Sequence, residues 1–260
     1  MLSRVAERMY WAGRYLERVE TTARLISVYD RLLLDLPPNT TLGWRQLLRV
    51  VSADDAYQQR HGEPSADGVL GFLLADPDHP GSLINALHWL RENIRTTRDI
   101  VPSEGWECVN ELYLSAKRKL PAAGTASDRF ESLEECISGC QLLSGLLHST
   151  MSHGAGYQFL RIGNYLERAD MTSRVVDVAA ATLAEAQQPG QAFTNTLWMG
   201  VLKSVSAYQM YRQYVRRRVT ADDAVRFLMG DRQFPKALGY TVDALSESVQ
   251  RLPNSDSVAT

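Results

Sequence analysis

Residues 11–25 read WAGRYLERVETTARL, and residues 160–175 read LRIGNYLERADMTSRV. Both stretches contain the run Tyr-Leu-Glu-Arg, which begins at Tyr15 in the first and at Tyr165 in the second. An internal match of this kind is typical of a duplicated structural unit. At an offset of 150 residues the match extends to four further pairs: Gly13 with Gly163, Glu20 with Asp170, Thr22 with Thr172 and Arg24 with Arg174.

Two further blocks match in the same order along the chain. Residues 44–57 match residues 198–211 at an offset of 154, and residues 66–83 match residues 221–238 at an offset of 155. Three collinear blocks predict a tandem duplication. The expected boundaries are a first repeat over 1–105, linking helices over 106–153, a second repeat over 154–252 and a frayed tail over 253–260, all within one compact domain.

Each repeat is predicted to contain four helices. In residues 3–34 the apolar positions alternate steps of four and three, which keeps one seam against a partner helix. Pro37 and Pro38 are expected to end this helix. No stretch alternates as a strand would. The sequence therefore predicts an all-α, internally duplicated bundle of about ten helices with pseudo-two-fold halves. The other expected helices are 41–60, 65–75 and 81–100, their counterparts in the second repeat, and two linking helices at 103–120 and 126–152.

Smaller features of the repeats give local predictions. Ser65 and its counterpart Thr220 precede acidic residues and are expected to cap helices. Ser52 and Ser206 recur at matched positions inside a predicted helix, and we interpret them as small packing residues.

Composition and charge limit the functional classes. The formal net charge is -2 with a pI near 6.2, which argues against recruitment by nucleic acid or an anionic membrane. The three cysteines show no zinc-site spacing, so no metal is expected. Residues 137–160 carry no charged side chain but are too polar for a membrane span. With no signal-peptide pattern at the N-terminus, a cytoplasmic location is expected.

Charged side chains form a stripe along the first helix. If Gly13 is placed at zero and each residue turns by 100°, Glu17 lies at about +40°, Glu20 at about -20° and Arg24 at about +20°. Leu16 lies at the margin of this strip, so the charges adjoin the packed seam. Arg18 and its counterpart Arg168 fall on a different face and are expected to serve separately. The second repeat has the same stripe, formed by Gly163, Glu167, Asp170 and Arg174.

Three interpretations of the stripe are open. The first is an exposed helix surface with ordinary Glu–Arg pairs. The second is a ligand-binding or catalytic cleft where the two stripes converge, and the third is a structural ion network between helices. Glycine inside a helix is costly, so its retention favours close approach of a backbone or a ligand. The first stripe continues towards the N-terminus through Tyr10, Arg14, Arg4 and Glu7, which the second repeat lacks.

Several catalytic signatures are missing from the sequence. There is no GxxxxGK[ST] phosphate loop, no GxGxxG and no GxSxG. None of the five histidines follows a glutamate by three residues, as di-iron bundles require. We therefore expect no cofactor on this chain alone.

The quoted segments, with residues 206–212 (SAYQMYR) and 226–238 (RFLMGDRQFPKAL), resemble the bacterial alpha-E family over nearly the whole chain. The resemblance implies a hetero-complex with an ATP-grasp ligase, which would carry ATP and Mg, and a peptide substrate joined, capped or tagged through amide bonds. Asn164 stands where the family often has Arg. The family's charged motif residues match Arg4, Glu7, Arg14, Glu17, Arg18, Glu20, Arg24, Glu167, Arg168, Asp170 and Arg174.

Two hypotheses follow from the stripe and the resemblance. In the first, the chain belongs to a peptide ligase complex and its Glu/Arg cleft binds or processes the peptide. In the alternative, the chain is a non-catalytic helical scaffold that docks and stabilises the ATP-grasp partner. The expected catalytic residues are Glu17, Glu20, Glu167 and Asp170, and the expected substrate-binding residues are Arg4, Glu7, Tyr10, Arg14, Arg18, Arg24, Arg168 and Arg174.

Overall fold

The structure is a computed structural model that describes residues 1–35, 43–186 and 190–253. Within these ranges it contains only helices, arranged as twelve α-helices and one short 3-10 helix, so the all-α prediction is confirmed. The helices of the first part are α1 Ser3–Asp35, α2 Trp44–Val50, α3 Asp54–His61, α4 Ala66–Ala75, α5 Leu83–Arg95, α6 Ser103–Lys119 and η1 Leu120–Ala122. Those of the second part are α7 Ala126–Thr150, α8 Ala155–Glu185, α9 Gln191–Ser204, α10 Tyr208–Tyr214, α11 Ala221–Gly230 and α12 Leu238–Gln250.

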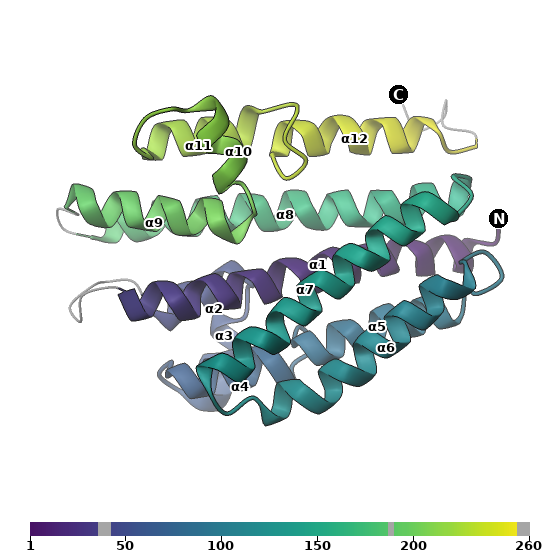
Figure 1. Ribbon diagram of the computed structural model, residues 1–260, viewed down its shortest axis with the longest axis horizontal. Coiled ribbons are helices and arrows are strands. Elements are labelled where there is room, and N and C mark those ends of the chain that lie inside the picture. The colour runs from purple at the N-terminus through teal and green to yellow at the C-terminus, as the bar shows by residue number, and fades with distance from the viewer. Residues whose placement is uncertain (36–42, 187–189, 254–260) are drawn as a thin grey trace.

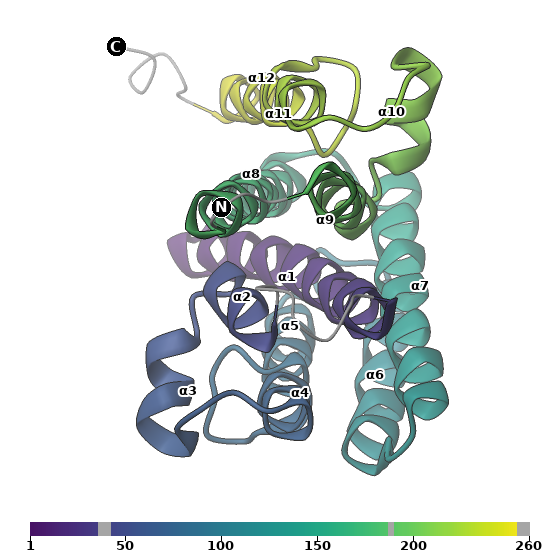
Figure 2. The ribbon, with the colours of Figure 1, turned by 90° about the vertical axis from the view of Figure 1, so that its left-hand side faces the viewer.

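The two longest helices, α1 and α8, form the centre of the molecule and lie side by side (Figure 1). Figure 2 shows α9 beside α8, with α10 to α12 above them and α2 to α6 below α1. The long helix α7 runs across one side of this stack and contacts α1 and α6. This arrangement buries most of the predicted seam of α1. Val5 is partly buried, and the other seam residues are buried, namely Met9, Ala12, Leu16, Val19, Ala23 and Ile26.

The expected second helix of each repeat is broken in the structure, which is why twelve α-helices replace the predicted ten. The break falls at Ser52, with φ 55°, and at Ser206, with φ 56°. At each break the amide after the serine donates to a carbonyl five residues earlier: Ala53 to Leu48 at 2.8 Å, and Ala207 to Leu202 at 2.7 Å. A left-handed residue with this hydrogen bond is the Schellman ending of a helix. The interpretation of the serines as packing residues inside a helix was therefore wrong.

Other local predictions are confirmed. Ser65 accepts a hydrogen bond from the amide of Gly68, and Thr220 accepts one from the amide of Asp223, so both cap their helices. The linking helices coincide with α6 and α7. Pro37, Pro38 and the tail from residue 254 lie outside the described residues.

The two series α1–α5 and α8–α12 present helices in the same order, broken at matched serines, and their lengths are similar except that α9 has 14 residues and α2 has 7. This correspondence supports the duplication, which stays a prediction, as do the repeat boundaries. Among the described residues, no helix combines the length and the apolar character needed to cross a membrane.

Candidate functional site

The site forms where α1 and α8 cross, and two glycines bring the helix backbones together there. A Cβ atom added to Gly13 would overlap the carbonyl oxygen of Leu160 and lie 2.8 Å from the amide nitrogen of Asn164. A Cβ atom on Gly163 would overlap the carbonyl oxygen of Tyr10. Only glycine permits such an approach. The glycines of the stripe therefore serve backbone contact, one of the two roles that their retention predicted.

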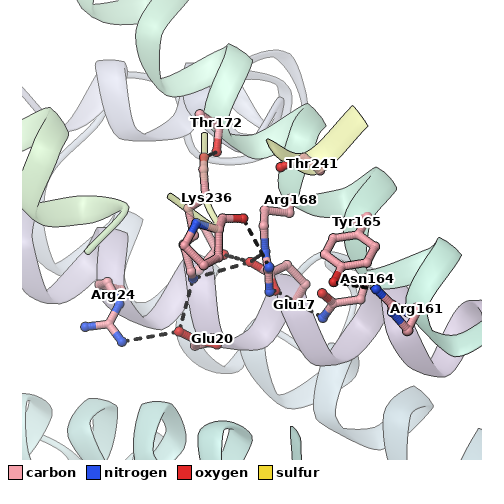
Figure 3. A network of polar contacts seen from close by, with 12 residues as sticks. Glu17, Glu20, Arg24, Arg161, Asn164, Tyr165, Arg168, Thr172, Lys236 and Thr241 are labelled. Carbon is pink, nitrogen blue, oxygen red and sulfur yellow. Dashed lines mark hydrogen bonds and ion pairs between the residues drawn. The ribbon is translucent and has the colours of Figure 1, made fainter. Parts of the chain in front are cut away.

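Glu17 of α1 is 1% exposed and lies at the centre of a polar network (Figure 3). Arg168 of α8 binds its carboxylate with two nitrogens, Nε to Oε1 at 3.1 Å and Nη2 to Oε2 at 2.7 Å. Asn164 donates to Oε2 at 3.1 Å, and Nζ of Lys236 lies 3.3 Å from Oε1. Thr21 donates to Oε1 at 3.4 Å. The buried charge is thus neutralised from the other half of the chain.

Glu167 of α8 is also 1% exposed and has the reciprocal surroundings. Arg18 of α1 binds its carboxylate with Nε to Oε1 at 2.6 Å and Nη2 to Oε2 at 3.0 Å. Nε of Arg14 donates to Oε2, and Nη1 of Arg14 donates to the hydroxyl of Tyr10 at 3.2 Å. A buried carboxylate is tolerated only with such pairing and hydrogen bonding.

We call the two carboxylates and their opposed arginines, Glu17 with Arg168 and Glu167 with Arg18, the crossed Glu–Arg lock. Each arginine also lies over the tyrosine three residues before it, with 5.4 Å from Cζ to the ring centroid of Tyr15 or Tyr165. The glutamate of each Tyr-Leu-Glu-Arg run therefore pairs with the arginine of the other run, across the crossing of the two helices.

The prediction that Arg18 and Arg168 serve separately from the stripe was wrong. Their positions on the helical wheel do point away from the glutamate of their own helix. The close crossing brings the other helix within reach of these long side chains, so each arginine crosses to the opposite glutamate.

Electrostatics fix the charge state of Glu17 and Arg168. Burial raises the pKa of Glu17, but the attraction of Arg168 and Lys236 and their hydrogen bonds outweigh it and lower the pKa to about 2. Burial lowers the pKa of Arg168, but Glu17 more than compensates and raises it above its ordinary value. The pKa of Arg14 is also raised, because the attraction of Glu167 outweighs the lowering by burial. Glu17 is therefore an anion at every physiological pH.

The outer part of the stripe is more accessible. Glu20 binds Lys236 at 3.1 Å and Nη2 of Arg24 at 3.3 Å. In the second stripe, Nε of Arg174 binds Asp170 at 2.8 Å, and the same guanidinium donates to the hydroxyl of Ser52.

Most of the predicted site residues lie along the interface of α1 with α8, but two do not join them. Arg4 and Glu7 are exposed near the start of α1. The sequence interpretation missed Lys236, which reaches Glu17 from the turn between α11 and α12. The one sequence signal for Lys236 is a difference between the repeats. Pro80 matches Pro235, but the next residue is Gly81 in the first repeat and the charged Lys236 in the second.

A pocket of about 180 Å³ borders the lock. Leu16, Asn164 and Arg168 line it together with Arg161, Tyr165 and His148. Within the described ranges, no group of three His, Cys, Asp or Glu side chains is placed to hold a metal ion.

Comparisons with known proteins agree with the geometry. The profile of Alpha-E, described as a predicted alpha-helical domain with a conserved ER motif, matches residues 1–260. Uncharacterized proteins of Mycobacterium bovis and Mycobacterium tuberculosis strain CDC 1551 are each 24% identical, in an alignment that covers 97% of this chain and 30% of theirs. A protein of strain H37Rv, also uncharacterized, is 23% identical over the same shares. The chain thus spans under a third of these relatives. No solved structure matches it.

Proposed function

This chain belongs to the Alpha-E family, and we propose that it is a helical scaffold within a larger amide-forming assembly. The observation that carries this proposal is the crossed Glu–Arg lock, in which both buried carboxylates are saturated by cations. A general base works best with a pKa near the working pH. Glu17, with its pKa lowered to about 2, is far from that condition and well suited to holding two helices in register.

The partner in this proposal is an ATP-grasp ligase, and the substrate is a peptide. ATP-grasp chemistry activates a carboxylate as an acyl phosphate, which an amine then attacks to form the amide bond. ATP and Mg would sit on the partner. The resemblance of both Tyr-Leu-Glu-Arg segments to the family supports this assignment. A cytoplasmic location, where ATP is available, belongs to the same proposal.

The relatives support a role within a larger protein. In each of them the matching region is 30% of the chain, so there the helical unit is part of a longer polypeptide. A scaffold that presents a rigid surface to neighbouring domains suits that position.

The experiment that tests the proposal is co-purification with the ligase and a ligation assay with and without this chain. The scaffold predicts that Glu17→Gln and Glu167→Gln lose partner binding and unfolding stability together, because the lock holds the docking surface. Glu131→Gln, at an exposed position on α7, is the matched control and should change neither. Unchanged ligation after complete removal of the chain would contradict the proposal.

The second candidate is a peptide-processing cleft, which the pocket beside Arg168 favours. Here the arginines bind substrate, and Glu20, with its side chain 12% exposed, is the more accessible of the two carboxylates that bind Lys236. Glu20→Gln should then abolish ligation while the protein stays folded and bound to its partner. The scaffold predicts nearly normal ligation for the same variant.

A further inference from the structure

A second cavity lies away from the lock, between α1, α7 and α9, and has a volume of about 330 Å³. Among the residues whose side chains the structure describes, Arg24, Arg31 and Lys203 line it with one carboxylate, Glu134. Val28, Leu32 and Met199 supply an apolar wall. Three cations against one anion give the cavity a positive balance.

The cations of this cavity have donors to spare. Among the residues whose side chains the structure describes, Arg31 and Lys203 lie within ion-pair distance of no carboxylate. The guanidinium of Arg31 is held 3.8 Å above the ring of Phe130, a contact that fixes its position without neutralising its charge. Arg24 binds Glu20 through Nη2, whereas its Nε is buried and has no hydrogen-bond partner in the described part of the chain.

The matched place in the first repeat is closed by ion pairs. Arg49 is the counterpart of Lys203, and it lies 3.8 Å from Asp54 and 3.0 Å from Glu185. Arg45 also binds Asp54, at 3.2 Å. At the matched position the second repeat has Tyr208 in place of Asp54, and Nζ of Lys203 faces the Tyr208 ring at 5.8 Å. The second repeat thus keeps the cation and has no carboxylate at the position that matches Asp54.

We propose that the α1–α7–α9 cavity is an anion-binding site that takes a carboxylate or phosphate group of a small ligand. The ligand's anion takes the place of the carboxylate that Asp54 supplies in the first repeat and is bound by Arg31 and Lys203, with Arg24, which also lines the cavity, as a third cation. The apolar wall accommodates the uncharged part of the ligand. This site is separate from the lock and does not depend on the ATP-grasp partner.

Calorimetric titration of the isolated chain at low salt with inorganic phosphate, and separately with succinate, tests the proposal. We expect saturable binding of at least one probe, weakened about tenfold or more in the double variant Arg31→Gln/Lys203→Gln. The variant should fold normally, because both side chains are exposed. Tighter binding of phosphate assigns a phosphate ligand, and tighter binding of succinate assigns a carboxylate ligand.

Two further variants sharpen this test. Arg49→Gln, at the matched and already neutralised position, should leave binding within about twofold of the wild type. Glu134→Gln removes the one like charge in the cavity and should tighten anion binding severalfold. Equal binding by the wild type and the double variant, or no binding of either probe up to about 20 mM, would overturn the proposal.

Discussion

The two halves of the molecule are nearly alike at the crossing of α1 and α8. They differ in which residue supplies the second cation to the buried carboxylate. Glu167 receives Arg18 and Arg14, both from α1, whereas Glu17 receives Arg168 from α8 and Lys236 from a distant turn. Where one half has Arg14 the other has Asn164, and the missing charge returns at Lys236. The two halves thus share the positive charge beside each buried carboxylate and differ in the residue that supplies it. The comparison teaches that the charge is what the crossing requires.

Outside the lock the halves diverge further. Arg49 is enclosed by Asp54 and Glu185, while Lys203 faces an open cavity. We infer that the shared crossing serves folding in both halves, and that the cavity beside Lys203 is the proposed anion site.

Among the comparisons between the two halves, the largest expected effect comes from the shared glycines. Gly13→Ala or Gly163→Ala should lower the free energy of unfolding by about 3 kcal/mol or more, because the added Cβ meets backbone that cannot move independently. Urea unfolding measures the loss. Gly145→Ala on α7, where nothing lies within 4 Å, is the control and should gain up to about 1 kcal/mol. Equal changes in the free energy of unfolding at the three sites would contradict the close backbone contact at Gly13 and Gly163.

Acid should weaken the lock by up to about 3 kcal/mol. The pKa of Glu17 falls from 4.5 to about 2 on folding, so its contribution is complete above about pH 5 and is lost as the pH falls towards 2. Unfolding free energies measured from about pH 5 to pH 2.5 should therefore decline more steeply for the wild type than for Glu17→Gln. The exposed control Glu131→Gln should follow the wild type, and parallel curves for all three proteins would contradict the assignment.

Moving the second cation of Glu17 from position 236 to position 164 should first lower the free energy of unfolding by about 2 kcal/mol and then restore most of that loss. Lys236→Met removes the second cation of Glu17 and should destabilise by that amount, as loss of a charged hydrogen bond does. Adding Asn164→Arg places a cation where the first half has Arg14 and should recover most of the loss. Chemical denaturation of the single and double variants checks this. A double variant no more stable than Lys236→Met would show that the two halves are not equivalent.

The smallest expected effect compares the matched serines. Ser206→Gly should stabilise by about 1 kcal/mol, because glycine adopts a positive φ without strain. Ser52→Gly should gain less, since it also removes the acceptor of Arg174. Thermal melts of the two variants measure the difference, which identical shifts would refute.

The sequence predicted the helices and most of the stripe because both depend on local periodicity. The seam from Met9 to Ile26 and the positions of Glu17 and Glu167 follow from steps along one helix. The breaks at Ser52 and Ser206 were missed because they carry neither glycine nor proline, the residues that usually signal a left-handed position.

The partners of the lock could not be found in the same way. Arg18 and Arg168 reach across a crossing whose closeness depends on packing, and Lys236 comes from a turn 219 residues from Glu17 in the sequence. Spacing along one helix says nothing about side chains that arrive from another. The tertiary arrangement therefore decided between an exposed stripe and a buried network.

The central claim is that Glu17 and Arg168 stabilise the molecule through each other. A double-mutant cycle of Glu17→Gln, Arg168→Met and the double variant, measured by urea unfolding, tests it most directly. We expect each single change to cost about 3–5 kcal/mol and the double change to cost little more than one of them, with a coupling of about 2 kcal/mol or more. Additive losses, with a coupling below about 0.5 kcal/mol, would contradict the account.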